Sequence, residues 1–142
     1  MDKGYKILSH PADVRVQTFG KTKQELFLNA MQGMVAVLRP QIRNSNIETR
    51  NIKVESVDLN ALLVDFLSEV LYLIQTNKEA YNRVEFKKFG PSTSSGQSVL
   101  EAELIGNKVE SFGEDIKAVT YHNLKIEKNK NGLYEATVLF DI

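Results

Sequence analysis

The stretch LNALLVDFLSEVLYLI, residues 59–74, constrains the fold more strongly than any other part of the chain. Its apolar residues recur at spacings of three and four, which is the period of an α-helix. They form a wide stripe that must be covered by a sheet. Asp58 or a neighbouring residue precedes the stripe and can cap the free N–H groups of the first turn. We therefore predict a core helix over these residues.

The region before this helix predicts a strand, a second helix and another strand. Residues 14–19 alternate with the period of a strand that ends at Gly20. Thr22 and Glu25 form a capping box at the start of an apolar pattern with helical spacing. Pro40 ends that helix. Residues 41–51 are polar and rich in asparagine, and the next predicted strand covers residues 52–57.

The region after Asn77 reads as a run of strands. Alternating apolar residues place them around residues 84–86, 100–104, 124–126 and 136–140. Residues 90–97 have the composition of a flexible hairpin loop, and no GK[ST] sequence follows that would indicate a phosphate-binding loop. Asn131-Gly132 suits the turn of the last hairpin. This order predicts one domain over residues 1–142 with a two-layer α+β fold, its two helices packed on one face of a mostly antiparallel sheet.

Composition excludes several classes of function. Lys and Arg number 18, as do Asp and Glu, so no net charge attracts a nucleic-acid backbone and a free-standing nucleic-acid binder is disfavoured. The chain has no cysteine, which excludes thiolate zinc sites and a cysteine nucleophile. Oxygen and imidazole ligands remain, and they favour a hard ion such as calcium or magnesium. No signal-peptide pattern and no stretch of roughly 18–20 apolar residues is evident, so we expect a cytoplasmic protein without membrane contact.

Two candidate sites lie at the ends of the chain. His10 and Asp13 flank a proline before the first predicted strand, where turn chemistry is the more common role for such residues. At the other end, Asp141 stands next to the carboxylate of Ile142. These oxygens could hold one hard cation. A frayed terminus is the alternative, although the apolar run up to Phe140 argues that this strand is docked.

Two further candidates lie inside the chain. Lys117 is a single lysine among small and apolar residues and could hold an anion, although most lysines, like most histidines such as His122, have no such role. Asp65 and Glu69 are four residues apart, hence on one face of the predicted helix, where like charges repel mildly. No set of nucleophile, base and orienting residue can be assembled, since GxSxG, HExxH and Walker motifs are absent.

The same four places resemble the archease family. HPADV at residues 10–14 resembles the family's opening His-Thr-Ala-Asp-Val, and residues 62–72 resemble its second helix. IKAVTYH at residues 116–122 is similar to its Val-Lys-Ala-Val-Thr-Tyr-His motif, and VLFDI at residues 138–142 closes the chain as the family does. The resemblance spans nearly the whole chain in order. It departs from the family at Pro11, at Phe66 and in a longer serine-rich loop over residues 92–98.

The resemblance implies a metal site and a function. Asp13, Asp141 and the carboxylate of Ile142 would bind a divalent cation, with calcium expected. The protein would be no enzyme itself, but an accessory that promotes guanylylation and multiple turnover of an RtcB-type ligase in tRNA splicing and RNA repair. It would bind the ligase, with no stable nucleic-acid binding of its own. The residues implied in this activation, with Lys117 first, are Lys117, His10, Glu69 and Asp65.

Two other interpretations stay open. The protein could be a general chaperone or modulator of RNA-modifying enzymes, acting through an apolar surface. It could also be a small metal-dependent hydrolase that uses Asp13 and Asp141 with His10 or Lys117 as acid and base. A pull-down would test the first interpretation, and nucleotide turnover by the protein alone would be needed for the second.

Overall fold

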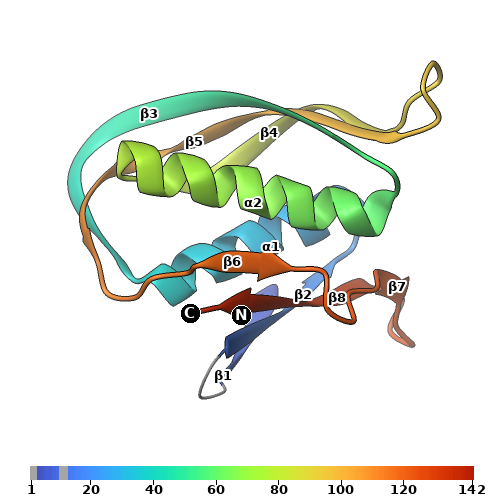
Figure 1. The fold of residues 1–142 in the computed structure, drawn as a ribbon, viewed down its shortest axis with the longest axis horizontal. Helices are drawn as coiled ribbons and strands as arrows, with labels where there is room; N and C mark the ends of the chain where they lie inside the picture. Colours follow the sequence, from blue (N-terminus) through green and yellow to red (C-terminus); the bar gives the residue numbers. More distant parts are fainter. Residues whose placement is uncertain (1–2, 10–12) are drawn as a thin grey trace.

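Two helices lie between two antiparallel sheets in the computed structural model, which describes residues 3–9 and 13–142 (Figure 1). Helix α1 (Lys23–Leu38) contacts strands of both sheets, and so does α2 (Leu59–Asn77). The predicted α+β class, two helices against mostly antiparallel strands, is confirmed. The strands are divided between two sheets, and the helices cover one face of each.

The sheet that contains the chain ends is built around its last strand, and we call it the β8 sheet. Its strand order is β1 (Tyr5–Ser9), β2 (Asp13–Gly20), β8 (Tyr134–Asp141) and β6 (Ala118–Thr120), and β7 (Glu127–Lys128) also pairs with β8. Side chains of β2 and β8 are buried at every second position, as the alternation of apolar residues predicted. The opposite face of these strands therefore points away from the core.

The other sheet, the β5 sheet, consists of β3 (Pro40–Ser56), β5 (Ser98–Phe112) and β4 (Glu79–Pro91), with β5 in the centre. Aromatic rings join it to both helices, because Phe27 of α1 and Phe66 of α2 lie near Phe86 and Phe89 of β4. The ring centroids of the contacting pairs are 4.9 to 6.5 Å apart. Aromatic contacts in this range stabilise a core beyond simple area burial.

The predicted helix caps are confirmed. The Thr22 side chain accepts a hydrogen bond of 3.0 Å from the Glu25 N–H, and Glu25 accepts one of 3.0 Å from the Lys21 N–H. Asp58 accepts one of 2.8 Å from the Ala61 N–H at the start of α2. Helix α1 ends just before Pro40, as predicted. Both helices therefore begin where the sequence has these local capping residues.

Helix α2 also has a membrane-like composition, contrary to the expectation that no stretch approaches the length of a membrane span. Over an 18-residue window its mean hydropathy is 1.3. Eight of its side chains are buried, and the helix lies between the two sheets. Its apolar character is therefore that of a core helix.

Several strand predictions need correction. Strand β3 begins at Pro40, because the polar residues 41–51 belong to an edge strand that pairs with β5 through two register shifts. Strands β1 and β6 were not predicted at all. Residues 124–126 do not form the predicted strand: the Leu124 N–H turns back to the Tyr121 carbonyl, and the Ile126 N–H donates to the Asn60 side chain. The predicted strands around residues 84–86, 100–104 and 136–140 lie within β4, β5 and β8.

The predicted turns are present. Residues 92–97 connect β4 to β5, closed by a bond of 2.6 Å from the Ser92 N–H to the Gln97 carbonyl. Gly132 has a φ of 80° in the turn before β8, where glycine carries no steric penalty.

Candidate functional site

Asp13 and Asp141 meet at one end of the β8 sheet. The antiparallel register of β2 and β8 places these two residues directly opposite each other. Residues paired in this way carry their side chains on the same face, with Cβ atoms about 4.5–5.5 Å apart. The next pair, Val14 and Phe140, is 7% and 0% exposed and faces the core. The two aspartates therefore lie on the outer face.

The end of β8 is paired on both sides. Ala118 of β6 lies opposite Asp141, and the Lys117 N–H donates a hydrogen bond of 2.7 Å to the Asp141 carbonyl. Ile142 is partly buried and packs against the core. The end of β8 is thus docked, not frayed: it lies beside β6 (Figure 1), and the Lys117 backbone is bonded to that of Asp141. The Lys117 side chain is exposed.

The chemistry of this group suits a hard divalent cation. Like charges directly opposite each other in a sheet destabilise it, so a cation near Asp13 and Asp141 would relieve their repulsion. Carboxylate oxygens are the ligands that calcium and magnesium prefer. Over residues 3–9 and 13–142, no three side chains of His, Cys, Asp or Glu are grouped closely enough to hold a metal ion. A cation here would need the Ile142 carboxyl group, water or a partner to complete its shell.

Asp65 connects α2 to the segment that carries Lys117. Its carboxylate accepts a hydrogen bond of 2.5 Å from the Tyr121 hydroxyl and one of 2.6 Å from the Ser56 hydroxyl at the end of β3. The bond to Asp65, followed by partial burial and the charges of Asp65 and Asp58, raises the pKa of Tyr121 to about 12. A neutral tyrosine can donate this bond, and a phenolate cannot.

Two further side chains of α2 hold the same segment. Gln75 donates a hydrogen bond of 2.9 Å from Nε2 to the Ile116 carbonyl, and Asn60 accepts one of 2.9 Å from the Ile126 N–H. Together with Asp65 we call these residues the α2 clamp. The clamp fixes residues 116–126 along the helix at three points, and Lys117 lies between two of them.

Comparison with known proteins identifies the family of this chain. Residues 5–142 match the model of the archease protein family (MTH1598/TM1083). The chain belongs to the archease family. It is 37% identical over 144 residues to the archease of Methanosarcina barkeri, covering 99% of this chain and 97% of that protein. It is 30% identical over 136 residues to the archease of Thermococcus kodakarensis, covering 94% of each chain.

Solved structures show the same archease fold. The solution structure of protein 1598 of Methanobacterium thermoautotrophicum has a TM-score of 0.76 and 26% identity, covering 99% of this chain and 100% of that chain. The crystal structure of an archease from Thermotoga maritima, named a possible chaperone, has a TM-score of 0.68 and 20% identity, covering 96% of each chain.

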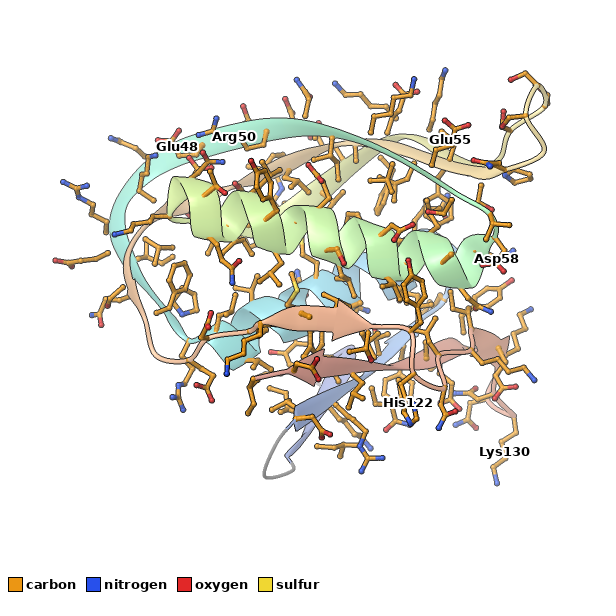
Figure 2. The ribbon with its side chains drawn as sticks, viewed as in Figure 1. Glu48, Arg50, Glu55, Asp58, His122 and Lys130 are labelled. Carbon is orange, nitrogen blue, oxygen red and sulfur yellow. The ribbon has the colours of Figure 1, made fainter. Side chains whose placement is uncertain are left out.

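The other residues singled out in this archease sequence lie apart from the aspartate pair or cannot be placed. His10 lies outside the described residues. Glu69 is partly buried on α2, one helical turn after Asp65. His122 follows β6 at the end opposite Lys117 and lies near the turn before β7 (Figure 2). Its Nε2 is 3.2 Å from the Asn123 side-chain nitrogen, and its ring is exposed.

The sequence did not indicate the α2 clamp residues Asn60 and Gln75, the Asp65 partner Tyr121, or a buried carboxylate. The clamp had a weak signal, since polar side chains border the apolar stripe of residues 59–74. The buried carboxylate is Glu79 at the start of β4, whose side chain is 0% exposed. Its charged partners, Arg50 and Lys108, lie on two other strands, so no local sequence pattern indicates them.

The α2 clamp gives a first prediction. Tyr121→Phe should lower the free energy of unfolding by about 1 kcal/mol, because it removes a hydrogen bond to a charged group at a side chain that is 56% exposed. Urea unfolding at pH 7 measures the change. Tyr72→Phe is the matched control, since Tyr72 is 59% exposed on α2, the helix that carries Asp65, and it should shift stability by less than about 0.5 kcal/mol. Equal effects of both variants would argue against a clamp at Tyr121.

Proposed function

We propose that this protein is an accessory activator of an RtcB-type tRNA-splicing ligase in the cytoplasm. It would promote guanylylation and multiple turnover of the ligase in tRNA splicing and RNA repair, without catalysing a reaction by itself. Membership of the archease family supports an accessory role. The observation that carries the proposal is that Asp13 and Asp141, far apart in the sequence, pair directly at one end of the β8 sheet, with the Lys117 backbone bonded to Asp141.

In this proposal Asp13, Asp141 and the carboxyl group of Ile142 hold a divalent cation, and the ion we expect is calcium. When bound, such an ion supplies positive charge that can neutralise phosphate oxygens. The pairing of β2 with β8 brings the carboxylates together before any ion arrives. Lys117 is bonded to Asp141 through its backbone N–H, and its exposed ammonium group, with three donors, is accessible to a docked partner.

The surroundings of this group suit a protein partner better than RNA. The chain has a formal net charge of +0, so no general attraction for phosphate backbones competes with docking on a ligase. Asp65 would act indirectly, by holding Tyr121 and with it the segment that carries Lys117. His10 and Glu69 are proposed to support the same activation.

The test is multiple-turnover RNA ligation by an RtcB-type ligase with GTP and a divalent metal ion. Adding substoichiometric amounts of this protein should carry the ligase beyond one turnover per enzyme. A ligase shown to complete a single turnover is the control. No stimulation of such a ligase would contradict the proposal and favour a chaperone or modulator of RNA-modifying enzymes. Nucleotide hydrolysis by the protein alone would instead favour the metal-dependent hydrolase.

A further inference from the structure

A cavity of about 580 Å³ opens over α1, between β1 and the start of β4. Its volume lies within the range of roughly 300–1,000 Å³ typical of small-molecule sites. The cavity is lined by residues of α1, of the chain entering β1 and of β4. It therefore lies between the edges of the two sheets. The lining residues that matter here are Lys3, Tyr5, Asn29, Gln32, Arg39 and Asn82.

The charge of this cavity is positive. Lys3 and Arg39 line it, and among the residues that the structure describes no aspartate or glutamate does. The last turn of α1 adds a partial negative charge of roughly half an elementary charge, which two full positive charges exceed. A second cavity, of about 510 Å³, has the opposite character, because three acidic side chains and one lysine line it. The chain as a whole is neutral, so the positive charge is a local feature.

Arg39 lines this cavity, and its side chain is fixed by a bond to Gly113, a residue that lines the second, acidic cavity. Arg39 caps α1 with a φ of 47°, in the left-handed region where glycine is the usual residue. Its guanidinium donates a hydrogen bond of 2.7 Å from Nη2 to the Gly113 carbonyl. A Cβ at Gly113 would lie 2.8 Å from Arg39 Nε, so glycine there leaves room for the guanidinium. A guanidinium has five N–H donors, and the bond to Gly113 leaves others for an anion.

The remaining lining groups fit an organic body attached to that anion. Asn29 and Gln32 donate to backbone carbonyls at 2.7 and 3.0 Å, which fixes both amides and leaves their oxygens able to accept from a ligand. The Lys3 ammonium lies over the Tyr5 ring at 5.9 Å from the centroid, so a ligand ring that packs against Tyr5 must replace it there. We propose that this cavity binds a small organic phosphate, with the phosphate at Arg39 and Lys3 and a ring system against Tyr5.

Titration of the isotope-labelled protein, followed by NMR, tests this site with three probes: AMP, adenosine and inorganic phosphate. AMP should saturably shift the side-chain amide signals of Asn29, Gln32 and Asn82. Adenosine and inorganic phosphate should each bind at least about tenfold more weakly, because each lacks one half of the recognised group. Absence of a saturable AMP shift at these amides, or equal binding of either fragment, would overturn the assignment.

Two variants locate the phosphate. Arg39→Gln should weaken AMP binding at least about tenfold, through loss of charge-assisted hydrogen bonds. Lys3→Gln should also weaken it and removes only an exposed side chain, so it remains informative if Arg39→Gln disturbs the end of α1. Arg83→Gln is the matched control, because Arg83 lies on β4 outside the cavity lining and pairs with Glu85. AMP affinity unchanged in both Arg39→Gln and Lys3→Gln would overturn the proposal.

Discussion

Asp141→Asn should abolish calcium-dependent stabilisation of this protein while leaving its fold intact without calcium. The substitution removes one of two carboxylates that face each other across β2 and β8. Without an ion, it should be neutral or stabilise by up to about 1 kcal/mol, because a like-charge pair is relieved. With an ion, affinity should fall at least about tenfold, since ligand charge sets the affinity of calcium sites. Asp13→Asn should likewise lose the response to calcium.

Thermal unfolding with a chelator and with increasing calcium separates these two effects. Calcium at about 100 times its Kd should stabilise the unsubstituted protein by about 2.7 kcal/mol. Glu127→Gln is the matched control, since Glu127 lies on β7, which pairs with the other end of β8, and is exposed. It should keep the full response to calcium. A response to calcium in Asp141→Asn equal to that of Glu127→Gln would remove Asp141 from the ion site.

The same variants connect the ion to the proposed activation of a ligase. Asp13→Asn and Asp141→Asn should lose most of the stimulation of multiple-turnover ligation, and Glu127→Gln should retain it. Full stimulation by a folded Asp141→Asn protein that no longer responds to calcium would show that the ion is dispensable for activation. The proposal would then rest on Lys117 and the docking surface alone.

Residue types at the candidate site could be predicted from the sequence, but their arrangement could not. Asp141 was recognised because an apolar strand ends in a carboxylate, which is a local pattern. That Asp13 lies directly opposite depends on the register of β2 and β8, and two residues at opposite ends of the chain carry no sign of that register. The bond from the Lys117 N–H to Asp141 is hidden for the same reason. Only the family resemblance joined these residues in advance.

The predictions of the fold show the same difference between local signals and long-range contacts. Both helices were predicted closely, because caps such as Thr22 and Asp58 and the apolar spacing lie within a few residues of each other. Strand β3 was underestimated, because residues 41–51 gain their strand structure from pairing with β5. The predicted strand at residues 124–126 is replaced by a bond from the Ile126 N–H to Asn60 of α2. Contacts between residues far apart in the sequence decided both strand cases.

Glu79 is the clearest example of a group that sequence could not reveal. Its carboxylate accepts hydrogen bonds of 2.9 and 2.8 Å from Arg50 of β3 and one of 2.6 Å from the Tyr81 hydroxyl. Lys108 of β5 is 3.3 Å away. Figure 2 shows Arg50 on β3 beside the C-terminal end of α2, with Asp58 at the opposite end of that helix. Three strands of the β5 sheet are therefore joined at one buried charge.

Glu79→Gln should lower the free energy of unfolding at pH 7 by about 3 kcal/mol. The amide keeps the size of the side chain but leaves Arg50 and Lys108 facing a neutral group with its own N–H donors, and removal of one partner from a buried ion pair costs about 3–5 kcal/mol. We expect a loss at the lower end of this energy range because the Arg50 and Lys108 side chains are each 37% exposed. Glu85→Gln is the control: its pair with Arg83 is exposed, so the change should be below about 1 kcal/mol.

The effect of Glu79→Gln should depend on pH with a definite sign. Hydrogen bonds from Arg50, then from Tyr81 and Lys108, hold the pKa of Glu79 at about 2 against burial, which acts in the opposite direction. Because this folded-state pKa lies below the ordinary value of 4.5, the charged form stabilises the fold above pH 4.5, and this contribution disappears as the pH falls toward 2. Urea unfolding of both proteins should thus give a full difference at pH 7 and a smaller one at pH 3. An equal difference at the two pH values would mean that shape, and not the charge of Glu79, stabilises this junction of strands.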